Sequence, residues 1–124
     1  MGTSLRVRGG GEGGPLLLLL HGLGATGDVW AGWAQLLERD WPGRWAAPDL
    51  PGHGGSAPLP EYTFDALAEA VLPLVTPGER TVALGHSLGG VVALALAART
   101  PIAAVAGLGV KVDWPEADLG RAAA

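Results

Sequence analysis

A chain of 124 residues has the length of one domain and can bury one hydrophobic core, so a second domain is not expected. Twelve acidic residues against eight basic ones give a formal net charge of -4 without any basic block, which argues against nucleic acid or an acidic membrane surface as a partner. The absence of cysteine excludes disulfides, thiolate catalysis and thiolate metal sites.

The first twenty residues contain two strand candidates. Alternating side chains at 5–8 predict a short edge strand within a segment, 1–14, that is otherwise glycine-rich and flexible. The uninterrupted apolar run at 15–20 predicts a parallel strand that is covered on both faces. This run is too short for a signal-peptide core or a membrane span, so we expect a cytoplasmic protein that does not enter the membrane.

A helix and a second strand are expected next. The helix runs from Asp28 to about Arg39, and either Thr26 or Asp28 is available as its N-cap. Its apolar positions at helical spacing are Val29, Trp33, Leu36 and Leu37. Residues 44–49 predict a short strand that opens into a glycine-rich loop at 50–56.

The second half of the chain again alternates helices with strands. Thr63 is expected to cap a helix in which one face is formed by Phe64, Leu67 and Val71. Residues 80–84 predict a strand, and the segment 91–98, rich in alanine and leucine, predicts a buried helix. One more apolar strand is expected at 102–112, followed at 113–124 by the start of a further helix.

Strands and helices that alternate at this spacing predict an α/β fold with a mainly parallel sheet and helices on both faces. The core strand and helix units span 15–112. The last strand, 102–112, would lie at an edge of the sheet where further strands should cover it.

Residues Gly85 to Gly90 read Gly-His-Ser-Leu-Gly-Gly and join a predicted strand to a predicted helix. Such a turn forces Ser87 into a strained backbone conformation and holds its hydroxyl above the sheet, beside the partly positive start of the helix. Gly85 and Gly89 leave room for the strand and the helix to approach closely. Taken alone, the pentapeptide at 85–89 fits equally well a glycine-rich turn with an incidental serine.

Three motifs, each following a predicted strand, together resemble the N-terminal half of an α/β-hydrolase of the serine esterase and lipase type. They are His21-Gly22-Leu23-Gly24, the segment DLPGHGGS at 49–56, and the serine turn at Gly85–Gly90. The resemblance covers residues 5 to 112.

The resemblance implies a serine hydrolase that cleaves a small-molecule ester or related acyl compound through an acyl-enzyme on Ser87, without a cofactor. Its oxyanion hole would consist of the backbone N–H groups of Leu23 and Leu88. A serine at this position is similar to the esterases and unlike the haloalkane dehalogenases or epoxide hydrolases of the family, which have an aspartate there.

The resemblance also implies that parts are missing. The family places an acid and then a histidine after the nucleophile, yet residues 88–124 contain no histidine. Asp113 is a candidate acid, although an aspartate that leaves a strand more often caps the next helix. Because a serine hydroxyl is a poor nucleophile without a base, we expect an N-terminal fragment or truncated form, with the C-terminal part of the fold missing and little activity alone.

The three histidines are not expected to replace the missing base. We expect His21 to orient its loop through a side-chain hydrogen bond and His53 to be a turn residue. His86 should point away from Ser87, because neighbouring side chains at a strand end face opposite sides. No histidine is spaced with another His, Asp or Glu at i, i+4 on a predicted helix, so no metal site is expected.

Two alternatives from other classes remain open. A G-x-G-x-x-G pattern follows the first buried strand, with Asp49 at the end of the next strand; its glycines are Gly22, Gly24 and Gly27. These features fit an NAD(P)-binding Rossmann-like domain, in which the acid holds the ribose, but they leave the Gly85–Gly90 motif unexplained. The other alternative is a hydrolase-like binding module without catalysis. The oligomeric state is left open.

Overall fold

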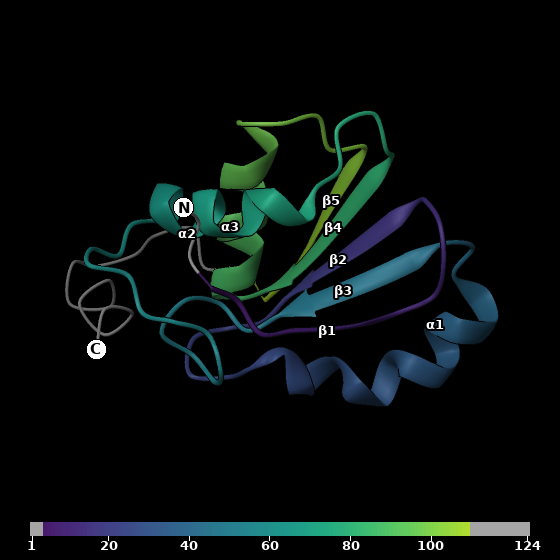
Figure 1. The fold of residues 1–124 in the computed structure, drawn as a ribbon, viewed down its shortest axis with the longest axis horizontal. Helices are drawn as coiled ribbons and strands as arrows, with labels where there is room; N and C mark the ends of the chain where they lie inside the picture. Colours follow the sequence, from purple (N-terminus) through teal and green to yellow (C-terminus); the bar gives the residue numbers. More distant parts are fainter. Residues whose placement is uncertain (1–3, 110–124) are drawn as a thin grey trace.

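The computed structural model describes residues 4–109, whose strands form one five-stranded sheet in the order β1-β3-β2-β4-β5 (Figure 1). The strands are β1 (Val7–Gly10), β2 (Leu16–Leu20), β3 (Arg44–Pro48), β4 (Thr81–His86) and β5 (Ala104–Leu108). β1 pairs antiparallel with β3, and the other three pairs are parallel. The predicted α/β fold with a mainly parallel sheet is confirmed.

Helices cover both faces of this sheet, as the sequence predicts (Figure 1). On one face the 3₁₀ helix η1 (Gly27–Trp33) leads into α1 (Ala34–Asp40). On the other face α2 (Phe64–Val71), extended by the short 3₁₀ turn η2 (Leu72–Leu74), packs beside α3 (Leu88–Ala97).

The central strand β2 connects the two halves of the core. All five of its leucines are buried, because successive side chains of a strand point to opposite faces and both faces are covered. Leu16, Leu18 and Leu20 belong to the cluster on the side of α2 and α3. Leu17 and Leu19 pack on the other side, in the cluster that contains Trp30 and Leu37.

The continuous helix predicted from Asp28 to Arg39 is wrong in its first half, which is a 3₁₀ helix. The Thr26 side chain caps it by accepting a hydrogen bond from the Asp28 N–H. Because a 3₁₀ helix has three residues per turn rather than 3.6, the buried position in η1 is Trp30 rather than the predicted Val29, which is 53% exposed. In α1 the predicted Leu37 is buried, whereas the predicted Leu36 is 48% exposed.

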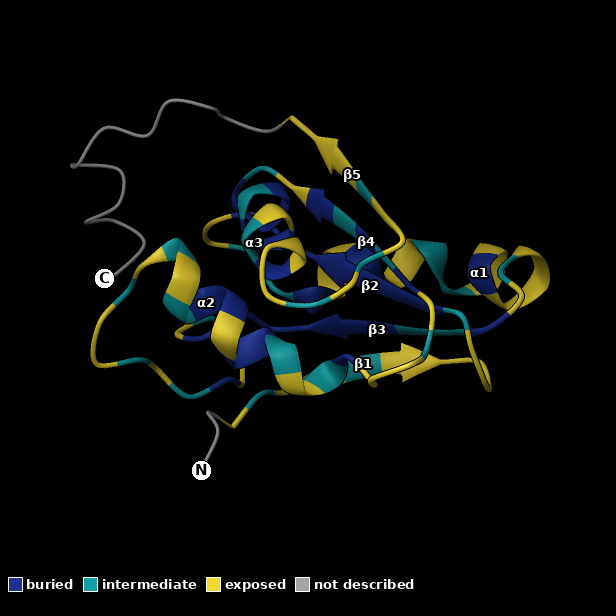
Figure 2. Cartoon of the chain, turned by 90° about the horizontal axis from the view of Figure 1, so that it is seen from above, coloured by how far each residue is buried: buried dark blue, intermediate teal, exposed yellow. Residues whose placement is uncertain are grey.

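The two edge strands are exposed while the central strands are buried (Figure 2). The edge strand predicted at 5–8 begins two residues later, at Val7. The strand predicted at 102–112 is the shorter β5, which begins at Ala104 and ends at Leu108. Residues 110–112, Asp113 and the helix expected at 113–124 lie outside the described residues. Among residues 4–109, no helix has the length and apolar character needed to cross a lipid bilayer.

The close packing of α3 on the sheet depends on two glycines. β4 continues two residues beyond its predicted end at Leu84, and the chain then turns directly into α3. A Cβ on Gly85 would collide with the backbone carbonyl of Gly89, and a Cβ on Gly89 would collide with the backbone carbonyl of Leu20. The start of α3 therefore lies directly against the backbone of both central strands.

We predict that Gly85→Ala lowers the free energy of unfolding by about 3 kcal/mol or more, because the new methyl group must displace backbone. The matched control is Gly32→Ala in η1, where a Cβ would meet no heavy atom within 4 Å. This control should be neutral or stabilising by about 0.5 kcal/mol. Urea unfolding followed by circular dichroism measures both, and equal effects would contradict the packing argument.

Candidate functional site

The candidate site lies at the carboxyl ends of β2 and β4, where the order of the strands reverses. From β2 the chain passes to β3 on one side, and from β3 it crosses over to β4 on the other side of β2. Ligands of open parallel sheets bind in the crevice at such a switch point. The segments that follow these two strands are the loop that begins at His21 and the turn at Ser87.

Ser87 has the strained backbone conformation expected of the turn. Its φ of 53° and ψ of -117° make it the one non-glycine residue with a positive φ among the described residues. Its N–H donates to the Leu108 carbonyl of β5 at 2.8 Å, and its carbonyl accepts from the Gly90 N–H at 3.0 Å. Such a conformation costs of order 1–3 kcal/mol and persists only where the surroundings hold it.

The loop after β2 lies directly beside this serine. A Cβ on Gly22 would lie 3.3 Å from the Ser87 Cβ and 3.1 Å from the His86 Nδ1, so only a glycine leaves this space open. Leu23 follows Gly22 in the loop, and Leu88 begins α3. Within residues 4–109, the backbone N–H groups of Leu23 and Leu88 donate to no protein acceptor. The structure thus brings the three predicted site residues, Ser87, Leu23 and Leu88, together at the carboxyl ends of β2 and β4.

A pocket of about 330 Å³ opens beside Ser87. Besides Ser87, Gly22 and His86, its wall is formed by Leu23, Ala25, Val29, Trp30, Trp33 and Leu108. The indole rings of Trp30 and Trp33 lie 5.0 Å apart at 86°, an edge-to-face arrangement. The wall is therefore mainly apolar. A larger cavity of about 480 Å³ lies away from Ser87, between the connections that precede β4 and β5.

His21 is fully buried and holds its own loop. Its Nε2 accepts from the Leu50 N–H at 2.8 Å, so its Nδ1 carries the proton and donates to the Gly22 carbonyl at 2.7 Å. Burial lowers the pKa of His21, and this effect outweighs the hydrogen bond to Gly22, which raises it. The orienting role expected for His21 agrees with these bonds.

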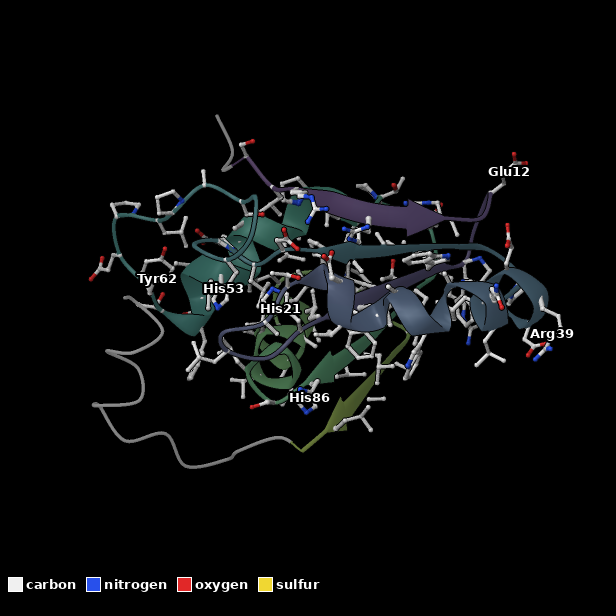
Figure 3. All side chains as sticks on the ribbon, turned by 90° about the horizontal axis from the view of Figure 1, so that it is seen from below. Glu12, His21, Arg39, His53, Tyr62 and His86 are labelled. Carbon is white, nitrogen blue, oxygen red and sulfur yellow. The ribbon has the colours of Figure 1, made fainter. Side chains whose placement is uncertain are left out.

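His53 does more than the turn role expected of it. From the loop after β3, its Nε2 accepts from the Gly24 N–H at 3.1 Å, and its Nδ1 lies 3.1 Å from the Pro51 carbonyl. Its ring centroid lies 5.0 Å from that of His21, and the two side chains lie side by side (Figure 3). His86 is exposed and lies apart from both (Figure 3).

The Asp49 carboxylate connects the loop after β2 with the loop after β3. Its carboxylate is buried and accepts from the Gly27 N–H at 2.7 Å, from the Gly55 N–H at 2.9 Å and from Arg6 at 3.3 Å. Burial alone would raise the pKa of Asp49, but the hydrogen bonds from Gly55, Gly27 and Arg6 together lower it below its ordinary value.

These contacts argue against the dinucleotide-binding alternative. The Asp49 carboxylate already holds two backbone amides and a guanidinium, so it is not presented to a ribose. The parallel strands follow the order β3-β2-β4-β5, in which the third parallel strand of the chain lies beside the first. In the Rossmann order that third strand would lie beside the second.

Residues 4–109 bring neither a metal cluster nor a hydrogen-bonded base to Ser87. No group of three or more His, Asp or Glu side chains within residues 4–109 could hold a metal ion. No side chain in this part of the chain hydrogen-bonds to the Ser87 hydroxyl. The candidate acid Asp113 lies outside the described residues.

Comparison with known proteins identifies relatives of the chain. Residues 15–124 match the profile of a family described as alpha/beta hydrolase fold. The magnesium-chelatase 30 kDa subunit of Rhodobacter capsulatus is 40% identical over 114 residues, which are 86% of this chain and 38% of that protein. A pimeloyl-[acyl-carrier protein] methyl ester esterase of Methylococcus capsulatus is 40% identical over 102 residues, 82% of this chain and 38% of that protein.

Two solved structures have a fold similar to that of this chain. A hydrolase from Pseudomonas aeruginosa PA01 superposes with a TM-score of 0.80 at 33% identity, over 94% of this chain and 45% of that one. An esterase from Thermogutta terrifontis gives a TM-score of 0.77 at 29% identity, over 93% of this chain and 44% of that one. The chain thus spans less than half the length of the proteins that it matches.

We predict that Ser87→Gly raises the free energy of unfolding by about 1 kcal/mol relative to Ser87→Ala. Relief of strain of about 1–3 kcal/mol should exceed the extra backbone entropy that glycine loses on folding, about 0.5–1 kcal/mol. Urea unfolding of the two variants measures the difference. A less stable glycine variant would show that the backbone at position 87 is not strained.

We also predict that Asp49→Asn lowers the free energy of unfolding by about 2 kcal/mol at pH 7, since charge-assisted hydrogen bonds are lost. The lowered pKa of Asp49 means that its carboxylate stabilises the native chain above 3.8, its ordinary value. That stabilisation is lost as the pH falls from 3.8 through the lower native pKa. The difference between variant and wild type should therefore shrink in urea titrations at pH 3, and a constant difference would contradict this role.

Proposed function

Because the chain belongs to the α/β-hydrolase fold family, we propose that Ser87 is the nucleophile of a serine hydrolase that cleaves a carboxylic ester or related acyl compound. The single observation that carries the proposal is the positive φ of Ser87 in the turn between β4 and α3. A strained serine in a turn whose neighbouring glycines tolerate no side chain is costly to maintain, and it directs a hydroxyl toward the pocket.

Two backbone amides support an acyl-transfer reaction at this serine. When Ser87 Oγ attacks an acyl carbon, negative charge develops on the carbonyl oxygen. The N–H groups of Leu23 and Leu88, which have no acceptor within the described part of the chain, would stabilise that charge. Loss of one such donor costs roughly 3–4 kcal/mol in comparable sites. The partly positive start of α3 acts in the same direction.

The general base must come from elsewhere. Both ring nitrogens of His21 and of His53 are engaged in the loops, and residues 88–124 contain no histidine. His86 lines the pocket but makes no hydrogen bond to Ser87 within the described residues. We therefore assign the 124 residues to the N-terminal part of a longer hydrolase, whose later residues supply the histidine and its acid. The 38% share of the two curated relatives that the chain covers supports this assignment.

The pocket favours a small apolar group beside the scissile bond. Its volume of about 330 Å³ and its wall, in which Trp30, Trp33 and Leu108 take part, suit an alkyl or aromatic acyl or alcohol group. The esterase of Methylococcus capsulatus, by its name, acts on a methyl ester. An ester with one small apolar side is thus the substrate class that we propose.

A fluorophosphonate with external imidazole tests the nucleophile directly. In this reaction Ser87 Oγ bonds to phosphorus, fluoride leaves, and imidazole takes the hydroxyl proton. The chain alone should be labelled slowly, and imidazole should accelerate labelling of Ser87 by about tenfold or more, since it supplies the missing base. Peptide mass spectrometry locates the adduct and measures its rate.

The controls for this experiment are the other two serines. Ser4 is exposed and Ser56 is buried, and both should remain unlabelled while Ser87→Ala removes the label. Equal labelling of Ser4 and Ser87 would refute activation by the turn. A folded chain that is never labelled at Ser87 would favour the alternative of a binding module without catalysis.

A further inference from the structure

Two histidines join the loop after β2 to the loop after β3 by reciprocal hydrogen bonds. His21, in the first loop, accepts from the Leu50 N–H of the second loop at 2.8 Å. His53, in the second loop, accepts from the Gly24 N–H of the first loop at 3.1 Å. We call these two side chains the histidine clasp.

The partners of the histidine clasp determine its protonation state. A backbone amide can only donate, so Nε2 of His21 and Nε2 of His53 both carry a lone pair and no proton. Each ring keeps its proton on Nδ1, where His21 donates to the Gly22 carbonyl and His53 donates to the Pro51 carbonyl. The clasp therefore exists only while both rings are neutral.

The clasp fixes the residues on both sides of Leu23. The Gly22 carbonyl accepts from His21, and the Gly24 amide is held by His53. Leu23 and Gly24 form the centre of a tight turn, in which the Ala25 N–H donates to the Gly22 carbonyl at 3.2 Å and Gly24 has a φ of 79°. The clasp adds one hydrogen bond at Gly22 and one at Gly24, which orient this turn relative to the loop after β3. The Leu23 side chain is 37% exposed, so packing alone does not fix this peptide.

We propose that His53 is a positioning residue that, together with His21, orients the Leu23 N–H toward the oxygen of the bound acyl group. The proposal rests on the proposed function of Ser87. It assigns the loop after β3 a part in the reaction, although that loop contributes no residue to the wall of the pocket.

A purely structural role predicts a different outcome. The bond between Gly24 and His53 is open to solvent, and such a bond adds little to folding stability because water replaces it. If the clasp positions Leu23, its loss should slow the reaction at Ser87 far more than it destabilises the chain.

Two substitutions at one position separate the acceptor from the ring. His53→Gln keeps an oxygen acceptor at about the reach of Nε2, whereas His53→Asn keeps only a donor near Nδ1. With imidazole present, fluorophosphonate labelling of Ser87 should fall about tenfold or more in His53→Asn and stay within about threefold of wild type in His53→Gln. Tyr62→Phe is the matched control, because it removes a hydrogen bond to the Leu59 N–H within the same connection and leaves the clasp intact.

Nitrogen NMR of the imidazole rings tests the clasp without any reaction. In the wild-type chain at pH 8, His21 and His53 should both be protonated at Nδ1, and the exposed His86 provides the reference. Ser87 labelling that is equal in wild type, His53→Asn and His53→Gln would overturn the positioning role while leaving the proposed function intact. A wild-type chain that is never labelled would overturn the proposed function, and rings protonated at Nε2 would overturn the clasp itself.

Discussion

The contact of backbone with backbone at Gly85 and Gly89 is the constraint on which the rest of the structure depends. Because neither residue has a Cβ, the start of α3 lies directly against β2 and β4. The chain must then reverse within one residue, and Ser87 takes the positive φ that this reversal requires. The Leu88 amide consequently lies at the open end of α3, beside the loop that contains Leu23. The same close contact thus packs α3 on the sheet and positions Ser87 and Leu88 in the candidate site.

Buried polar groups complete this arrangement by holding the loops. His21 and Asp49 are almost fully buried, and each has hydrogen-bond partners both in its own loop and in the neighbouring loop. Burial of a polar group without a partner costs free energy. These hydrogen bonds avoid that cost and hold the two loops in place. Asp49, which the sequence offers as a ribose ligand, is therefore occupied by the protein itself.

Much of the fold and the site's position follows from local patterns. The leucine run at 16–20 and the glycines around Ser87 are local signals, because five consecutive leucines require cover on both faces and the absence of a Cβ permits close backbone approach. The sequence does not predict the 3₁₀ helix η1, since the apolar residues at 28–39 have a spacing that resembles that of an α-helix. The bond between His53 and Gly24 spans 29 residues, and no local pattern indicates the acceptor role of His53.

The Ser87 N–H is bound to the carbonyl of Leu108, the last residue of the outermost strand. β5 is held by β4 on one side, and its side chains are largely exposed, so it belongs to the least protected part of the described sheet. Local opening of such an edge requires less free energy than global unfolding. Local opening of β5 would therefore also release the backbone of Ser87, and any surface that covers this edge of the sheet would hold the serine turn in place.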